Sequence, residues 1–449
     1  MNARIRAAIT ILFVLAFFMT APVVLMLTSG YRYNWKRQRI QKTGIIQVDT
    51  TPPGAQVFLD GTHQRKATPA VFPRLLPEDY HVRIEKKEYL PWEKTLEVRS
   101  GETTFATGIV LYKDAVPRLV VDRDVVAASW SPDGTDVIFL ADDGGWKELV
   151  AVADGMEPVL LARFTRDAYA DPAISWSPNG EMVLFSAAAT DGGTHVLRFR
   201  PDAPTAALVL HENFPKGALV ARWSDDGSRV AIVSADGVFS ADAGTGAVSP
   251  LLLVTGVKDA DMRGRSTYAL LTIRGDDGQD AVALERLNGG DEARVLLLPA
   301  GDYRFLEGDE RYLLISDDKK RRITLVDAAN AATQTYEATG AAWETKGRRL
   351  LLWNDFEIFT VNVSDGSRDL ITRIGAPIVG CAWSPSGEAV LFATSNGISI
   401  AELDGRDHRN VFDLVRFTNV GPFAVDPAAN ILRFVGSVGN QRGMYEREL

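Results

Sequence analysis

The side chains that could do chemistry in this chain are few and scattered. Metal sites and acid–base catalysts usually bring histidines, cysteines or carboxylates together at short, regular spacings. The five histidines instead lie in separate stretches with no HExxH or other paired spacing: His63, His81, His195, His211 and His408. The single cysteine, Cys381, lies in an apolar run and is interpreted as a small core residue. We therefore expect no catalytic residue, no metal site and no cofactor.

A recurring serine invites a nucleophile interpretation, at Ser131, Ser177, Ser224 and Ser384. A hydrolase serine would lie in a Gly-x-Ser-x-Gly turn, which none of these has. A serine repeated at the same place in each copy of a motif is more simply a turn residue. The acidic run at 276–280 lacks the ligand order of an EF-hand, and the charged run at 317–322 is predicted as a hairpin tip.

Those serines belong to a repeated phrase that organises the chain from about residue 115 onward. It reads Trp-Ser-Pro-Asp-Gly at 130–134, with near copies at 176–180, 223–227 and 383–387 and a weaker one at 343–347. Proline fixes φ, glycine allows a positive φ, and apolar runs flank the phrase, so each copy predicts a β-hairpin. The predicted structural repeat residues are Trp130, Trp176, Trp223, Trp343 and Trp383 with Gly134, Gly180, Gly227, Gly347 and Gly387.

Spacing locates copies that have lost the tryptophan. The gap of 120 residues between Trp223 and Trp343 leaves room for two hidden units, which we place at Met262 and Phe305, with a last unit at Val425. Further Asp-Gly turns, at 154–155, 365–366 and 404–405, bring each unit to about four strands. Eight such units predict an eight-bladed β-propeller, closed by pairing a strand at 117–122 with the last unit; seven blades are the alternative.

The repeated phrase resembles the WD40-like repeat of the periplasmic TolB protein and of related bacterial propellers, over about residues 115–449. The resemblance implies a fold and says little of function, because the repeated residues build blades and mark no ligand site. An ordinary β-sandwich with unrelated core tryptophans is disfavoured by four near-identical five-residue copies.

A different unit occupies residues 44–114. Alternating runs at 45–48, 56–59, 81–85, 95–98 and 105–111 predict a small β-sandwich. The phrase at 51–61 resembles the PEGA domain through four residues: Pro52, Pro53, Gly54 and Ala55. Glu78 and Glu88 stand where that family has glycine, and we expect these two turns to have changed type. The resemblance implies an envelope surface module that contacts cell-wall polymers or other proteins.

The chain begins with an apolar segment. Residues 7–28 contain no charged side chain and twelve Ile, Leu, Val or Phe residues, enough to span a bilayer. Residues 7–29 are therefore predicted as an uncleaved transmembrane anchor. A cleaved signal peptide is the alternative, because Arg4 and Arg6 form a basic start, although Pro22 directly after the small-residue site argues against cleavage.

Residues 30–43 form a basic and aromatic segment after the anchor. The predicted membrane-interface residues, which would sit on anionic lipid headgroups, are Tyr31, Tyr33, Trp35, Lys36, Arg37 and Arg39. Counted literally, the basic residues place the C-terminal part in the cytoplasm. The exported modules that the later units resemble argue the other way, and we expect residues 1–6 inside the cell and the domains outside. The net charge of −9 opposes a nucleic-acid partner.

Together these patterns predict an all-β protein with one N-terminal transmembrane helix, a PEGA-like sandwich at 44–114 and an eight-bladed or seven-bladed propeller at 115–449. We expect a non-enzymatic binding protein of the cell envelope, whose propeller presents a face to a protein or cell-wall glycan. The alternatives are a propeller hydrolase acting on envelope glycans or lactones, and a cytoplasm-facing membrane scaffold.

Overall fold

The computed structural model describes residues 3–153, 157–190, 192–214, 217–274, 279–288, 291–308, 311–344, 349–438 and 441–449. The chain divides into two compact units, which are described separately below. Unit 1 is Met1–Ala115 together with Glu402–Phe412, and unit 2 is Val116–Ala401 together with Asp413–Leu449. Unit 1 therefore includes a short segment that comes nearly three hundred residues later in the sequence than the rest of it.

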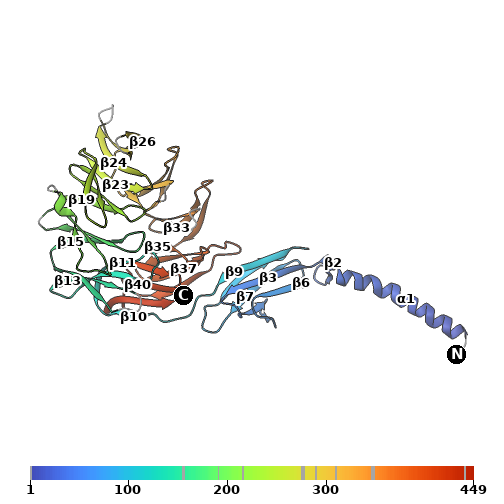
Figure 1. Cartoon of the computed structure of the whole chain (residues 1–449). Coiled ribbons are helices and arrows are strands. Elements are labelled where there is room, and N and C mark those ends of the chain that lie inside the picture. The colour runs from blue at the N-terminus through green and yellow to red at the C-terminus, as the bar shows by residue number, and fades with distance from the viewer. Residues whose placement is uncertain are drawn as a thin grey trace. The chain divides into compact units, whose positions relative to one another are not determined.

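Unit 1 begins with helix α1 (Ala3–Thr28), the long blue helix of Figure 1. Its segment Ile9–Thr28 has a mean hydropathy of 2.5 and exposes its apolar side chains, for example Phe13 at 72% and Met19 at 76%. A helix of this length and composition suits a membrane anchor or a signal sequence. Directly after it, within the segment expected as a linker, β1 (Tyr31–Asn34) and β2 (Arg39–Lys42) form a hairpin.

A two-sheet sandwich follows the hairpin. One sheet has the strand order β6-β3-β9 and the other β5-β4-β7-β8. The strands are β3 (Gly44–Thr51), β4 (Gln56–Leu59), β5 (Thr62–His63), β6 (Ala70–Leu75), β7 (Asp79–Glu85), β8 (Trp92–Glu97) and β9 (Thr103–Val110). Alternate residues of these strands, among them Val57, Val82 and Ile84, are fully buried between the sheets. The predicted runs are confirmed as strands, whereas β5 and β6 were not predicted.

The two glutamates that replace family glycines behave differently. Among the described residues with positive φ, Glu88 is included at +69° and Glu78 is not. Glu78 thus avoids the left-handed backbone conformation. The expectation of a changed turn type is wrong for Glu88, which keeps the left-handed backbone at a cost on the order of 1–2 kcal/mol. Gly54 and Gly61, at +84° and +75°, keep the conformation that glycine favours.

Unit 2 is a succession of antiparallel four-strand groups, and Figure 1 shows several of their strands in colour order from green to red. Its first strands are β11 (Asp124–Trp130), β12 (Val137–Asp142), β13 (Trp146–Val152) and β14 (Val159–Thr165). Next come β15 (Tyr169–Trp176), β16 (Val183–Ala189), β17 (Thr194–Phe199), β18 (Leu208–Val209) and the short helix η1 (His211–Asn213), then β19 (Ala218–Trp223), β20 (Arg229–Ser234), β21 (Gly237–Asp242) and β22 (Val248–Leu252). A single pair, Thr194 with Ala218, links these two groups.

The remaining groups repeat the same up-and-down order. They are β23 (Val257–Arg263), β24 (Ser266–Arg274), β25 (Asp280–Asn288) and β26 (Asp291–Pro299); β27 (Tyr303–Leu306), β28 (Tyr312–Asp317), β29 (Arg322–Asp327) and β30 (Thr333–Glu337); β31 (Gly340–Trp343), β32 (Arg349–Trp353), β33 (Glu357–Asn362) and β34 (Arg368–Arg373); and β35 (Ile378–Trp383), β36 (Ala389–Thr394), β37 (Gly397–Glu402) and β38 (Val411–Arg416).

The last sheet joins the two ends of unit 2. It has the order β10-β41-β40-β39, from β10 (Arg118–Val121), β39 (Phe423–Asp426), β40 (Ile431–Val438) and β41 (Gln441–Glu448). The predicted pairing of a strand at 117–122 with the last unit is thereby confirmed. Val435 and Met444 of this sheet share an apolar core with Val125 and Phe139 of the β11–β14 group. Pairing with β10 covers the edge of β41 that β40 leaves open, which protects that strand from pairing with another chain.

Strand pairing tests the placement of the copies that depart from the Trp-Ser-Pro-Asp-Gly phrase. These copies, at Met262, Phe305, Trp343 and Val425, are called the worn copies below. In all five tryptophan copies the tryptophan pairs with the residue seven positions later, as Trp130 does with Val137. Val425 pairs with Leu432 at the same spacing, which confirms the placement of the last copy. Met262 pairs with Thr267 across a tighter turn, and Phe305 pairs with Ile315 across a wider one. These two hairpins are present as predicted, with different turn lengths.

Candidate functional site

The repeat tryptophans join each unit to the one before it. Four indole N–H groups donate to a backbone carbonyl of the preceding unit at 3.0–3.1 Å: Trp176 to Ser129, Trp223 to Ser175, Trp343 to Glu307 and Trp383 to Ala342. Trp130 differs, because its Nε1 is buried and has no hydrogen-bond partner within the described chain. It lies beside a cavity of about 350 Å³ lined by residues of 128–134 and 422–425.

The repeat serines build turns, as predicted. The hydroxyl of Ser177 donates to Asn179 Oδ1 at 2.6 Å and accepts from Met182 N at 2.9 Å. Ser131, Ser224 and Ser384 make the same pair of contacts in their own turns. The glycines that follow have φ between +72° and +75° in the four intact copies, Gly134, Gly180, Gly227 and Gly387. Gly347 of the weak copy lies outside the described residues.

These turns also lower the pKa of carboxyl groups within them. The Ser224 hydroxyl, together with the N–H and hydroxyl of Ser228, lowers the pKa of Asp226 to about 2. Hydrogen bonds from Ser131 and Thr135 lower the pKa of Asp133 in the equivalent position. Both carboxylates are therefore fixed as charged acceptors at neutral pH, which suits a turn and not a general acid.

Three worn copies lack the serine and have a carboxylate and an arginine near the turn; the carboxylate takes the serine position at Glu344 and Asp426, whereas Asp261 precedes Met262. In each, the arginine binds an acid of its own unit and also donates to a backbone carbonyl of the next unit. Arg349 binds Glu344 at 2.6 Å and Gly387 O at 2.8 Å. The other two sets are Arg433 with Asp426 and Gly134 O, and Arg263 with Asp261 and Gly308 O. Burial raises the pKa of Asp261 although Arg263 opposes the shift.

The scattered chemistry-bearing residues stay mostly apart. Among the described residues, no three His, Cys, Asp or Glu side chains come together as a metal site would require. Burial raises the pKa of the Cys381 thiol well above its usual value, which disfavours a thiolate. The structure does bring His195 and His211 together, with ring centroids 3.9 Å apart, a contact that the sequence did not predict. Of the acidic run at 276–280, residues 276–278 lie outside the described residues, as do 154–155 of the Asp-Gly turns.

The PEGA-like phrase shapes one loop of the sandwich. Ala55 is fully buried, and its N–H donates to Thr68 Oγ1 at 3.0 Å, while Thr68 Oγ1 also lies 2.6 Å from Thr50 Oγ1. Gly54 N donates to Thr68 O at 2.7 Å, and Lys86 Nζ donates to Pro53 O. With Pro52 preceding them, these residues hold the loop between β3 and β4 and leave the phrase without a free reactive group.

The predicted membrane-interface residues lie on the β1–β2 hairpin. Tyr31, Tyr33 and Trp35 are 39%, 44% and 83% exposed, and the Tyr33 and Trp35 rings meet edge to face with centroids 4.8 Å apart. Arg37 and Arg39 are exposed beside them, and Lys36 makes a long ion pair of 3.6 Å with Glu78. Exposed aromatic rings among basic groups, directly after an apolar helix, match the composition of a membrane interface.

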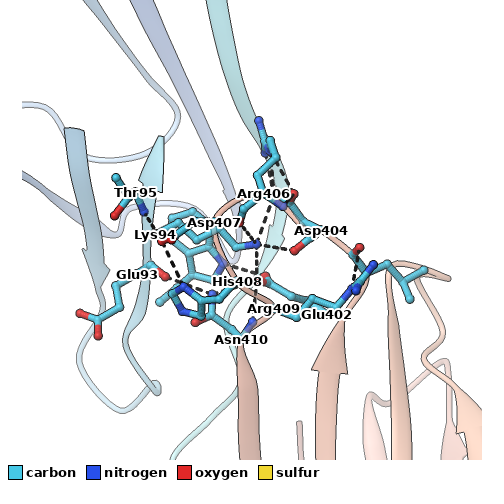
Figure 2. A network of polar contacts seen from close by, with 12 residues as sticks. Glu93, Lys94, Thr95, Glu402, Asp404, Arg406, Asp407, His408, Arg409 and Asn410 are labelled. Carbon is cyan, nitrogen blue, oxygen red and sulfur yellow. Dashed lines mark hydrogen bonds and ion pairs between the residues drawn. The ribbon is translucent and has the colours of Figure 1, made fainter. Parts of the chain in front are cut away.

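The most unusual charged residue of unit 1 is Lys94, whose side chain is completely buried. Strand β8 alternates, so Trp92, Lys94 and Leu96 face inward while their neighbours are exposed. A buried ammonium group is costly unless it is paired and hydrogen-bonded. Lys94, its neighbours on β8 and the residues that contact them define the candidate site, here named the Lys94 cluster: Trp92, Glu93, Lys94, Thr95, Glu402, Asp404, Arg406, Asp407 and Asn410. Figure 2 labels all of these residues except Trp92.

The amine of Lys94 is fully satisfied by the segment Glu402–Phe412. Lys94 Nζ lies 2.8 Å from Glu402 Oε1 and donates to the backbone carbonyls of Asp404 and Arg406, with the Asp404 carboxylate 3.6 Å away. Glu402 is held in turn by the Trp92 indole N–H at 2.9 Å and by Asn410. The Lys94 amine therefore donates hydrogen bonds to several oxygen acceptors and is not available as a nucleophile.

The same segment covers backbone groups on the outer edges of both sheets. Thr95 N of β8 donates to Asp407 Oδ2 at 2.8 Å, and Glu93 O accepts from Asn410 Nδ2 at 3.2 Å. On the other sheet, Phe105 O of β9 accepts from Arg406 at 2.6 Å. Side chains thus replace the neighbouring strand that each edge lacks, which is one way in which proteins protect open edges.

Charge in the cluster is matched locally. Burial acts to raise the pKa of Asp404, but hydrogen bonds from Arg406 and the nearby Lys94 charge outweigh it and leave that pKa lowered. The Thr95 N–H is the main cause of the lowered pKa of Asp407. The cluster therefore holds ionised carboxylates at neutral pH. Chemically, the edge of the sandwich is a receptor for a peptide segment that carries carboxylates, occupied here by residues 402–410.

Sequence reasoning did not find the Lys94 cluster. The one local signal was the alternation of Trp92, Lys94 and Leu96, which places a lysine at an inward position of a predicted strand. A lysine there requires an acidic partner. The partner lies 308 residues away, at Glu402, beside a predicted Asp-Gly turn that carried no sign of this contact.

Comparison with known proteins agrees with this fold. A family model described as PEGA domain matches residues 43–109, the sandwich of unit 1. No curated protein matches the chain. Among solved structures, the crystal structure of the eukaryotic initiation factor is similar with a TM-score of 0.50 and 11% identity, covering 75% of this chain and 95% of that one. At this identity the likeness concerns the fold alone.

Two further solved structures are similar at lower scores. Dihydro-heme d1 dehydrogenase NirN in complex with DHE has a TM-score of 0.48 and 16% identity, covering 67% of this chain and 68% of that one. The Myceliophteria thermophila Cps50 (Swd1) beta-propeller domain has a TM-score of 0.39 and 16% identity, covering 62% of this chain and 97% of that one.

Proposed function

We propose that this chain is a membrane-anchored binding protein of the cell envelope, with its domains outside the cytoplasm. The observation that carries the proposal is the passage from α1 into the β1–β2 hairpin. An apolar helix of membrane-spanning length leads within three residues into exposed aromatic and basic side chains. Such an order places rings and cations at the headgroup level when the helix spans the bilayer.

In this proposal, unit 2 is an eight-bladed propeller of the TolB-like type. Eight four-strand groups lie among the described residues. This count takes the joined strands β15–β22 as two groups and includes the sheet of β10 and β39–β41. The repeat tryptophans, serines and arginines are committed to joining these groups. Binding is therefore assigned to the loops and turns between them, which a rigid scaffold presents.

A cavity of unit 2 supports a binding role. It measures about 710 Å³ and lies beside the repeat turns of the β11–β14 and β15–β18 groups. Its apolar wall includes Trp176 and Val159, and its charged lining is Asp136, Glu157, Glu181, Arg200 and Asp202. Four carboxylates against one arginine, which already pairs with Asp202 at 3.0 Å, suit a protein partner that inserts a lysine or arginine beside apolar side chains.

The anchor is tested by asking whether α1 remains on the mature protein. We expect the full chain to stay in the membrane pellet after alkaline carbonate extraction, and its intact mass to include α1. Release into the supernatant with a mass that lacks the first twenty or so residues, the length of the predicted apolar segment, would identify a cleaved signal sequence and contradict the anchor.

A second candidate function, a cytoplasm-facing membrane scaffold, rests on one specific observation. The exposed basic residues of the β1–β2 hairpin outnumber those at the start of α1, and the positive-inside rule read literally then places both units in the cytoplasm. Carbonate extraction gives the same result for both orientations. Labelling an exposed thiol of unit 1 from outside the cell separates the two orientations.

A further inference from the structure

We propose that the outer edges of β8 and β9 form a peptide-binding site, and that residues 402–410 are a built-in ligand occupying it. The ligand class is a peptide segment with a carboxylate for Lys94 and a second carboxylate for the Thr95 N–H. This inference goes beyond the proposed function, because it concerns unit 1 alone and holds on either side of the membrane.

The site is built before the segment arrives. Lys94 and Trp92 belong to β8 and point inward from it, so their positions are set by the strand and by the sandwich core. The Thr95 N–H, the Glu93 carbonyl and the Phe105 carbonyl are edge groups of β8 and β9. Together they offer two fixed N–H donors, an ammonium and two carbonyl acceptors. A peptide is the ligand that can satisfy all of these at once.

The segment is recognised at two ends. At its start, Glu402 bridges Lys94 and Trp92 with distances of 2.8 and 2.9 Å. At its end, Phe412 packs against the sandwich core and lies with its ring centroid 5.6 Å from that of Tyr112. Between them, Asp407 caps the Thr95 N–H. The recognised pattern is an early carboxylate, a central aspartate and a closing aromatic residue.

Most of the segment can leave without breaking a strand ladder. Strand β37 ends at Glu402 and β38 begins at Val411, so residues 403–409 lie between the two strands, and the backbone bond to be broken is that from Glu402 N to Asn410 O at 3.1 Å. Leaving Lys94 buried without an acid is costly, however, so a second peptide with the same pattern must replace the first. The resident segment has the advantage of being tethered, which gives it an effective concentration on the order of millimolar.

The test uses the full chain in detergent micelles and a fluorescein-labelled peptide of residues 402–412. The host carries Glu402→Gln, Asp404→Asn and Asp407→Asn, which weaken the resident segment and leave the sandwich residues unchanged. We expect the peptide to bind this host at least tenfold more tightly than the wild-type chain, whose site is filled. A peptide with Glu402→Gln is the matched control and should bind the host at least tenfold more weakly.

Two results would overturn the inference: no peptide binding to the triple variant, or binding that the Glu402→Gln peptide reproduces. The host is first shown to be folded by a circular dichroism spectrum that matches that of the wild-type chain, so absence of binding reports on the site, and the comparison of the two peptides on one host isolates the Glu402 carboxylate. Trypsin gives a second reading. Cleavage after Arg406 and Arg409 should be at least tenfold faster in the triple variant than in wild type, and Lys87→Ala, which removes a 93%-exposed lysine, should leave it unchanged. Equal cleavage of wild type and triple variant would show that the cluster does not hold the segment.

Discussion

The intact and worn copies of the repeat in unit 2 stabilise equivalent turns with different chemistry. In an intact copy the repeat serine acts locally, since the Ser177 hydroxyl bonds to Asn179 and Met182, two and five residues later. In a worn copy the arginine acts over a longer range, since Arg433 binds Asp426 and also the Gly134 carbonyl of the β11–β14 group. The serine therefore stabilises its own turn, whereas the arginine also binds the neighbouring group. In the three worn copies with such an arginine, loss of the serine accompanies a change from local to longer-range side-chain bonding.

The largest expected effect is at a worn copy. Asp426 is 3% exposed, pairs with Arg433 at 3.2 Å and accepts from Ala428 N and Ala429 N, so Asp426→Ala leaves a nearly buried arginine without its acid. We expect a loss of about 3–5 kcal/mol, the usual cost of breaking a buried pair. Hydrogen–deuterium exchange of β39–β41 should report it. Asp413→Ala, at an exposed pair with Arg416, is the control and should cost less than about 1 kcal/mol. Equal costs would remove the contrast between buried and exposed pairs.

A smaller difference in stability is expected between substitutions of two repeat tryptophans, Trp176 and Trp130. Trp176→Phe removes the N–H that binds Ser129 O at 3.0 Å, whereas Trp130→Phe removes an N–H that has no partner within the described chain. Both lose similar ring volume. We expect Trp176→Phe to destabilise unit 2 by about 1 kcal/mol more than Trp130→Phe does, measured as urea midpoints. Trp130→Phe costing as much or more would show that the Trp130 indole has a partner after all.

The smallest expected effect is on the pH dependence of stability at the intact turn that contains Asp226. The folded pKa of Asp226 is lowered to about 2, below the value of about 3.9 expected when unfolded, so its contribution to stability is complete above about pH 4 and is lost as the pH falls toward 2. The Ser224 hydroxyl is the main cause, so Ser224→Ala should raise that pKa and flatten the loss of stability between pH 5 and pH 3. Thermal melts of both proteins at the two pH values test this. Parallel pH profiles would assign the lowered pKa to another group.

The architecture of unit 2 could be predicted because most of its turns are specified by residues that are close together in the sequence. A tryptophan, a serine and a glycine at fixed spacing determine where each hairpin begins, and even Val425 kept the seven-residue pairing distance. The turns at Met262 and Phe305 changed length, and nothing in their residues indicated by how much. The serine-to-arginine replacement was also hidden, because Arg433 and its Gly134 acceptor lie 299 residues apart.

The Lys94 cluster could not be predicted for a related reason. Its members are polar residues typical of solvent-exposed positions in their own local sequence, and only the strand alternation at Lys94 departs from that pattern. A contact between β8 and a segment 308 residues later leaves no periodicity to detect. Buried polar networks of this kind are specified by tertiary structure, whereas amphipathic strands and turns are specified by neighbouring residues.

The measurement that tests the account most directly is the side of the membrane on which unit 1 lies. Lys87→Cys places a thiol at a 93%-exposed position of the sandwich, and a Cys381→Ala background removes the partly exposed native thiol, so that all labelling reports on position 87. Cells stripped of their outer layers are treated with a membrane-impermeant maleimide. Labelling of Lys87→Cys in intact cells is the predicted result and places unit 1 outside the cytoplasm. Labelling only after lysis would contradict the envelope role and favour the cytoplasm-facing scaffold.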